Sequence, residues 1–145
     1  MKRVWVLLLL FGLAFAAKVP VTALHLVPGV LWPAPTYRVL GPECDQLVAK
    51  VPLPQGKALK DAQCYRMVVA NPDDAATYLY FLARGLSQSF KLLKEEMKGE
   101  DALVQVWRGK PGTLYLYLKL EKSGFSIVAG WLVEKPAATP ANPGS

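Results

Sequence analysis

The region between residues 102 and 134 constrains the fold most, because it holds three strand-like runs with very little chain between them. Residues 102–108, 113–121 and 125–134 are rich in leucine, β-branched and aromatic side chains. Turn-forming residues connect them, and Pro111-Gly112 fits the two central positions of a type II turn. A parallel crossover needs a dozen or more residues, so the three runs must pair as an antiparallel meander.

The middle run has two chemically different faces, because side chains alternate across a strand. One face is purely apolar and carries Leu114, Leu116, Leu118 and Leu120. We expect this face to be buried against a helix. The other face carries Tyr115, Tyr117 and Lys119, and we expect Trp107 of the preceding run to lie nearby. This second face is solvated, covered by the N-terminal residues 18–35 or by the same face of another molecule, or a binding surface.

A long helix is predicted between residues 71 and 98. The sequence Asn-Pro-Asp-Asp at 71–74 combines an N-cap, a proline at the first helical position and acidic residues at the positive end of the helix dipole. Gly99 provides a stop signal. Apolar residues recur at spacings of three and four and form one stripe, namely Ala75, Leu79, Leu82, Leu86, Phe90, Leu93 and Met97. Phe81 and Leu92 fall on the opposite side, where the N-terminal segment or a partner would cover them.

The first half of the chain predicts only short strands. Residues 18–35 contain four prolines among apolar residues, which favours an extended surface segment with an edge strand at 21–27. Three further short strands are expected at residues 36–40, 46–52 and 64–70, with a loop between the last two. The predicted fold class is therefore α+β, with one long helix packed on an antiparallel sheet that ends in the meander.

The first 16 residues have the form of a secretory signal peptide. A short basic start precedes an apolar run from Val4 to Ala17, and Ala14-Phe15-Ala16 fits the cleavage pattern. That run has only 14 residues, whereas a membrane-spanning helix needs about 20. We therefore expect an exported protein without a stable membrane span after cleavage. A single domain would occupy residues 17–135, and the proline-rich residues 136–145 would form a disordered tail.

Cys44 and Cys64 are the two cysteines of the chain, and in an exported protein an even number indicates a disulfide. The alternative is a pair of buried free thiols. Two cysteines and the single histidine, His25, are too few for a closed zinc site. No catalytic motif is recognisable, so an enzyme, a metal and a cofactor are not expected.

The charge pattern does not indicate nucleic-acid binding. Cleavage of the signal segment removes Lys2 and Arg3, and so two of the six excess positive charges. The densest basic run, residues 91–98, also contains Glu95 and Glu96. A nucleic-acid-binding domain usually has an unbroken basic stripe.

These features favour a non-enzymatic binding or interaction module of the periplasm or cell envelope, for a protein, peptide or glycan partner. Its expected contact surface is Trp107, Tyr115, Tyr117 and Lys119, because tyrosine and tryptophan combine flat apolar area with a polar group. One alternative is a homo-oligomeric structural protein with Phe81 and Leu92 in the self-contact. Another is a small-molecule or lipid carrier with a cavity lined by Leu82, Phe90 and Leu116.

Overall fold

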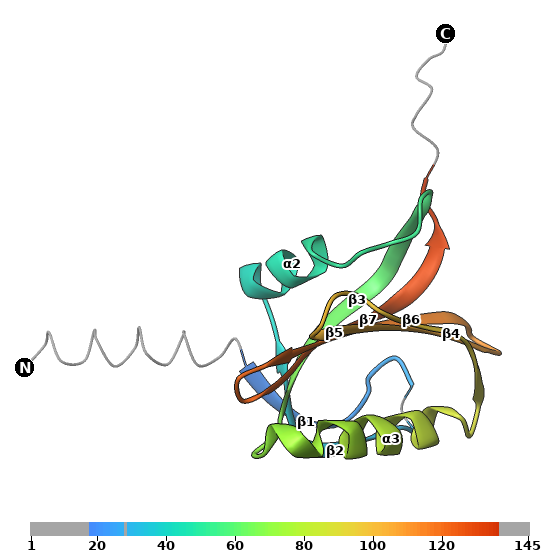
Figure 1. Ribbon diagram of the computed structural model, residues 1–145. Helices are drawn as coiled ribbons and strands as arrows, with labels where there is room; N and C mark the ends of the chain where they lie inside the picture. Colours follow the sequence, from blue (N-terminus) through green and yellow to red (C-terminus); the bar gives the residue numbers. More distant parts are fainter. Residues whose placement is uncertain (1–17, 28, 137–145) are drawn as a thin grey trace, which may run out of the picture.

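The computed structural model describes residues 18–27 and 29–136. Seven strands form one antiparallel sheet in the order β1-β2-β3-β7-β6-β5-β4 (Figure 1). The strands are β1 (Lys18–Ala23), β2 (Leu31–Val39), β3 (Lys57–Val68), β4 (Phe90–Met97), β5 (Ala102–Gly109), β6 (Gly112–Glu121) and β7 (Gly124–Glu134). The helical elements are α2 (Pro42–Ala49), the 3-10 turn η1 (Pro72–Asp74) and α3 (Ala75–Leu86). The predicted signal peptide and all but the first residue of the predicted tail lie outside the described residues.

The predicted fold class is wrong, because the long helix does not exist as one element. α3 ends at Leu86, and residues 90–97 form β4, which pairs antiparallel with β5. Helix propensity is only a weak preference, and in β4 the pairing satisfies backbone groups along the outer side of β5. The described residues instead form mostly a seven-stranded antiparallel sheet with two short helices. The expected cap is present but belongs to the turn η1, where the Asn71 side chain accepts a hydrogen bond from the Asp73 backbone N–H at 3.0 Å, and α3 itself begins at Ala75.

Three predictions for the first half of the chain are also corrected. Residues 46–52 are not a strand, because α2 begins at a proline with acidic residues in its first turn and runs to Ala49. The expected loop before Cys64 contains much of β3, a strand of 12 residues with an irregularity between Lys60 and Gln63. The expected edge strand at 21–27 is shifted, since β1 covers Lys18–Ala23 and pairs with β2.

The last three strands pair in chain order, β5 with β6 and β6 with β7, as their short connections require. The register places Trp107 opposite Leu114 and Val106 opposite Tyr115. Opposite residues in an antiparallel pair point to the same face of the sheet. Trp107 therefore lies on the leucine face, and Tyr115 lies on the other face.

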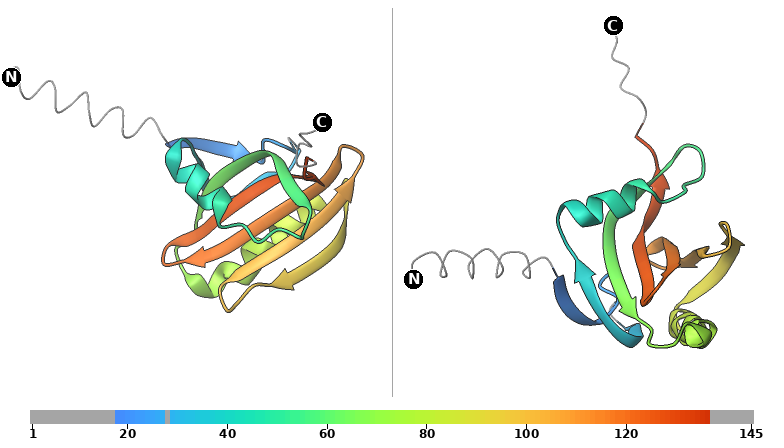
Figure 2. Two further views of the ribbon diagram at one scale, coloured as in Figure 1. Left: turned by 90° about the horizontal axis from the view of Figure 1, so that it is seen from above. Right: turned by 60° about the vertical axis from the view of Figure 1, so that its left-hand side comes forward.

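Each face of the sheet is covered by one helix, so the protein has three layers (Figure 2). α3 covers the leucine face, where Leu114, Leu116 and Leu118 are fully buried with Leu82 and Leu86 of the helix. α2 and the chain after it cover the opposite face, where a second buried cluster contains Val39, Val51, Cys64, Val104, Val106, Tyr115 and Val128. No helix within 18–27 and 29–136 is long and apolar enough to span a membrane.

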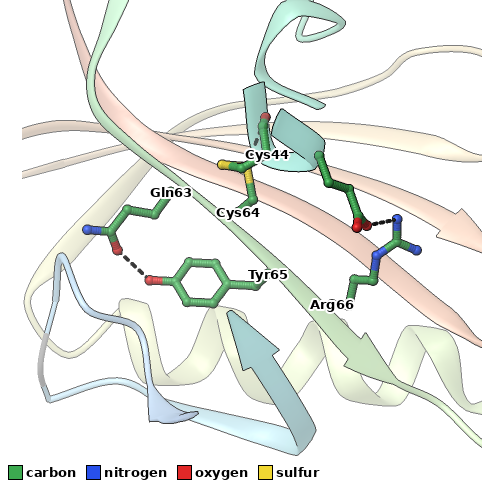
Figure 3. The surroundings of a disulfide bond; sticks show 6 residues. Cys44, Gln63, Cys64, Tyr65 and Arg66 are labelled. Carbon is green, nitrogen blue, oxygen red and sulfur yellow. Dashed lines mark hydrogen bonds and ion pairs between the residues drawn. A yellow bond between two sulfur atoms is a disulfide. The ribbon is translucent and has the colours of Figure 1, made fainter. Parts of the chain in front are cut away.

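The predicted disulfide is present and fastens α2 to the sheet. The sulfur atoms of Cys44 in α2 and Cys64 in β3 are 2.10 Å apart. Figure 3 shows Cys64 and Tyr65 on opposite sides of β3, with Cys64 turned toward α2. The bridge therefore holds the cover of the second face in place.

Candidate binding groove between α3 and β4

The predicted tyrosine surface is largely covered. Tyr115 is only 2% exposed, and its hydroxyl donates a hydrogen bond to the carbonyl oxygen of Pro52, in the segment that follows α2. Burial raises the pKa of the Tyr115 hydroxyl, and the nearby negative charge of Glu96 adds to this effect. Tyr117 is half-buried and Lys119 is exposed. The cover is supplied by α2 and its following segment rather than by residues 18–35.

Trp107 does not belong to the same surface as the tyrosines. It is 3% exposed on the α3 side of the sheet, and its Nε1 donates a hydrogen bond of 3.1 Å to Oε1 of Gln105. The four residues predicted to form one contact surface are thus divided between two faces. Side chains alternate within each strand as predicted, but the register between strands is not determined by the sequence.

Tyr117 and Lys119 do line a small crevice beside α2. Its volume is about 70 Å³, and Leu47, Lys50, Glu121, Ser126 and Val128 complete its wall. A water molecule occupies about 30 Å³ in the liquid. The crevice is therefore large enough for solvent or a small ion, and too small for a peptide or glycan.

A much larger groove lies between the C-terminal half of α3 and the beginning of β4. Its volume is about 720 Å³, and its lining residues are Tyr80, Ala83, Arg84, Ser87, Phe90, Lys91, Leu92 and Trp107. Phe90 and Trp107 are buried and form an apolar floor, whereas Tyr80 and Leu92 are exposed. We call this region the α3–β4 groove.

The α3–β4 groove has a positive rim. Arg84 and Lys91 form no ion pair with a carboxylate of the described residues, and no acidic side chain lines the groove. Toward the other end of β4, by contrast, Lys94 and Lys98 both contact Glu96. The two free cations therefore favour an occupant with negative charge.

β4 is the last strand of the sheet, so one side of its backbone is open. Among the described strands it pairs with β5 only. A register shift between Leu92 and Lys94 interrupts this pairing, and Leu93 and Met97 on the same strand are 57% and 58% exposed. An edge strand with exposed apolar side chains is a site at which another chain can add.

Phe81 and Leu92, the residues predicted for self-contact, are both accessible, with exposed fractions of 49% and 39%. The N-terminal half of the chain approaches the same side of α3 one turn further on, at Gly85, but leaves Phe81 itself exposed. A Cβ atom placed on Gly85 would lie 3.3 Å from a methyl group of Val30. The sequence does contain a signal for an exposed leucine here. Leu92 and Leu93 are consecutive, so they could not both lie on one apolar stripe of a helix.

The cavity expected for a carrier is occupied by packed side chains. Leu82, Phe90 and Leu116 belong to one buried cluster and are 1%, 6% and 0% exposed. No group of three or more histidine, cysteine, aspartate or glutamate side chains that could hold a metal occurs in the part of the chain that the structure describes.

Comparisons of this chain with protein-family models, with curated proteins and with solved structures find no significant match. Its function therefore has to be argued from the geometry of its own surfaces.

Proposed function

We propose that this protein is an exported, non-enzymatic binding module that takes an extended peptide segment of a partner in the α3–β4 groove. The class of function is the one that the sequence favours, but the surface is a different one. Export is supported by the apolar N-terminal segment and by the Cys44–Cys64 disulfide, which is typical of oxidising compartments.

The observation that carries the proposal is that an apolar floor, two unpaired cations and an open strand edge occur together. Trp107 and Phe90 provide the floor, and Arg84 and Lys91 stand beside it. A peptide that adds to β4 as a strand gains backbone hydrogen bonds, while alternate side chains enter the groove. Strand addition explains how a shallow groove can bind a peptide with useful affinity and in one orientation.

The charge of the groove defines the preferred peptide. An apolar or aromatic side chain would pack on Trp107 and Tyr80, and an aspartate or glutamate two residues away, on the same face of the added strand, would reach Arg84 or Lys91. The planar guanidinium of Arg84 can bind a carboxylate through two parallel hydrogen bonds. A peptide with lysine in place of the acidic residue would meet two like charges.

Fluorescence anisotropy with two matched peptides tests this proposal. Both are capped, alternate valine and threonine, and contain a central phenylalanine with either glutamate or lysine two residues after it. We expect the glutamate peptide to bind more tightly, with an affinity that falls as salt is added. Arg84→Gln should weaken it about tenfold, whereas Lys110→Gln in the β5–β6 turn should not. Equal binding of both peptides, or no effect of Arg84→Gln, would contradict the proposal.

Self-association is the second candidate, because Phe81 and Leu92 are exposed beside the open edge of β4. Light scattering separates the two functions. A mass that doubles with concentration, and returns to the monomer value in Phe81→Ser/Leu92→Ser, would support self-contact. A constant monomer mass would exclude it.

A further inference from the structure

A second pocket opens at the opposite edge of the sheet, and the peptide-binding proposal does not use it. Its volume is about 430 Å³, and its lining residues are Pro20, Val21, Thr22, Ala23, Leu24, His25, Arg38 and Tyr65. These residues come from β1, the segment after it, β2 and β3. The register pairs Arg38 with Tyr65, and Tyr65 belongs to the buried cluster on the α3 side. We call this region the Arg38 pocket.

Arg38 brings a positive charge into this pocket without a protein counter-charge. It forms no ion pair with any carboxylate of the described residues, and none of the lining residues is acidic. Its Nε atom is buried and has no hydrogen-bond partner. An unsatisfied charged donor in a protein is unfavourable, so a bound acceptor would stabilise it.

Arg66 on the neighbouring strand β3 is, by contrast, neutralised by carboxylates of the protein itself. Its Nε is also unpaired, but its two terminal nitrogens each bind a carboxylate at 2.9 Å, one from Glu43 and one from Glu121. Figure 3 shows Arg66 joined to its carboxylate partner on the α2 side of β3. Arg38 lies on the other face of the sheet, where the described residues offer no such partner.

Tyr65 does not neutralise Arg38. Its hydroxyl donates a 2.6 Å hydrogen bond to Oε1 of Gln63 and accepts one of 3.2 Å from the His25 backbone N–H. Burial raises the pKa of the Tyr65 hydroxyl, although the charge of Arg38 acts in the opposite direction. Tyr65 is therefore a neutral phenol at physiological pH, and its hydroxyl is already engaged by protein groups.

The remaining wall of the pocket is mostly apolar. Pro20, Val21 and Ala23 supply its accessible part, whereas Leu24 is fully buried. The exposed His25 stands at the rim. A cationic fork beside an apolar wall suits a ligand with one anionic group and a short hydrocarbon part.

We propose that the Arg38 pocket binds a small amphiphilic carboxylate. The carboxylate accepts hydrogen bonds from the Arg38 guanidinium, and the hydrocarbon part lies along Pro20, Val21 and Ala23. The site is separate from the α3–β4 groove, so either function can exist without the other.

NMR titration of the ¹⁵N-labelled protein with octanoate tests this site. The largest shift changes should fall on backbone amides of residues 22–25, 38 and 65. Acetate tests whether the head group alone suffices, and octylammonium tests whether the charge matters. We expect octanoate to bind at least tenfold more tightly than either.

Arg38→Gln removes the charge and should weaken octanoate at least tenfold, and Arg38→Lys should give an intermediate loss because it keeps the charge without the fork. Arg108→Gln is the matched control, since Arg108 is an exposed arginine on β5. Thermal unfolding checks that each variant is folded. The proposal is overturned if octanoate fails to bind, binds Arg38→Gln as well as the parent protein, or shifts only residues of the α3–β4 groove.

Discussion

The hydroxyl of Tyr115 donates a hydrogen bond to the carbonyl oxygen of Pro52, and so joins the middle of the sheet to the segment that follows α2. This contact explains why Tyr115 is covered. Val51, just before Pro52, is 8% exposed and packs in the same cluster as Tyr115. The second face of the sheet is thus a second core.

Tyr115→Phe should lower the free energy of unfolding by about 1 kcal/mol, because it leaves the Pro52 carbonyl without this partner. Urea unfolding followed by circular dichroism provides the measurement. Tyr117→Phe is the control, since no hydrogen bond from the half-buried Tyr117 hydroxyl occurs among the described residues. A Tyr115→Phe protein as stable as the parent would show that the hydrogen bond makes no net contribution.

The Cys44–Cys64 bridge should contribute about 3 kcal/mol by the chain-entropy argument, because it closes a loop across a sequence separation of 20 residues. Urea unfolding with and without reductant measures this difference. The double variant Cys44→Ala/Cys64→Ala is the control, because its midpoint should not respond to the reductant. Thiol titration of the unreduced, denatured protein should detect no free thiol, and two thiols per chain would refute the bridge.

The sequence predicts the elements that depend on local chemistry. The cap at Asn71 and the meander between residues 102 and 134 depend on turn residues and on connection length, and both can be read along the chain. The burial of Leu114, Leu116 and Leu118 against a helix follows from the alternation within a single strand. These features require no knowledge of which distant strands pair.

The division between α3 and β4 depends on long-range pairing and could not be read in the same way. Leu79, Leu82, Leu86 and Phe90 continue with the same spacing through the junction, and residues 91–98 are good helix formers. Pairing with β5 makes residues 90–97 a strand, because it satisfies backbone hydrogen-bonding groups that the sequence pattern does not describe.

The position of Trp107 depends on register in the same sense. A shift of one residue between β5 and β6 would have moved it to the tyrosine face, and the sequence does not choose between these registers. The α3–β4 groove was therefore beyond prediction, since it requires both the end of α3 at Leu86 and the register that brings Trp107 beneath it.

Gly124→Ala should destabilise the protein by about 2–3 kcal/mol, as expected for a clash that the backbone must relieve. A Cβ atom on Gly124 would lie 1.9 Å from the carbonyl oxygen of Met67, and the residue has a φ of +155°. Gly29→Ala is the matched control, because nothing lies within 4 Å of its added Cβ. Equal unfolding midpoints for the two variants would show that β3 and β7 do not approach this closely at Gly124.

Glu96 should remain ionised in the folded protein at pH values where an ordinary glutamate is protonated. Hydrogen bonds from Lys98 and then Lys94, together with their positive charges, lower the pKa of Glu96 from 4.5 to about 2. The nitrogen–oxygen distances are 2.6 Å to Lys98 and 3.0 Å to Lys94. Because the pKa is lower in the folded state, the contribution of Glu96 to stability is complete above about pH 4.5 and is lost as the pH falls toward 2.

The side-chain carboxyl ¹³C shift of Glu96, followed by NMR from pH 6 to pH 1.5, measures this pKa directly. Lys98→Gln should raise the midpoint most, because the Lys98 hydrogen bond is the largest cause of the shift, and Lys94→Gln should raise it less. Lys110→Gln, in the β5–β6 turn, should leave it unchanged. A midpoint near 4.5 in the parent protein would mean that Glu96 is not held between the two lysines in solution.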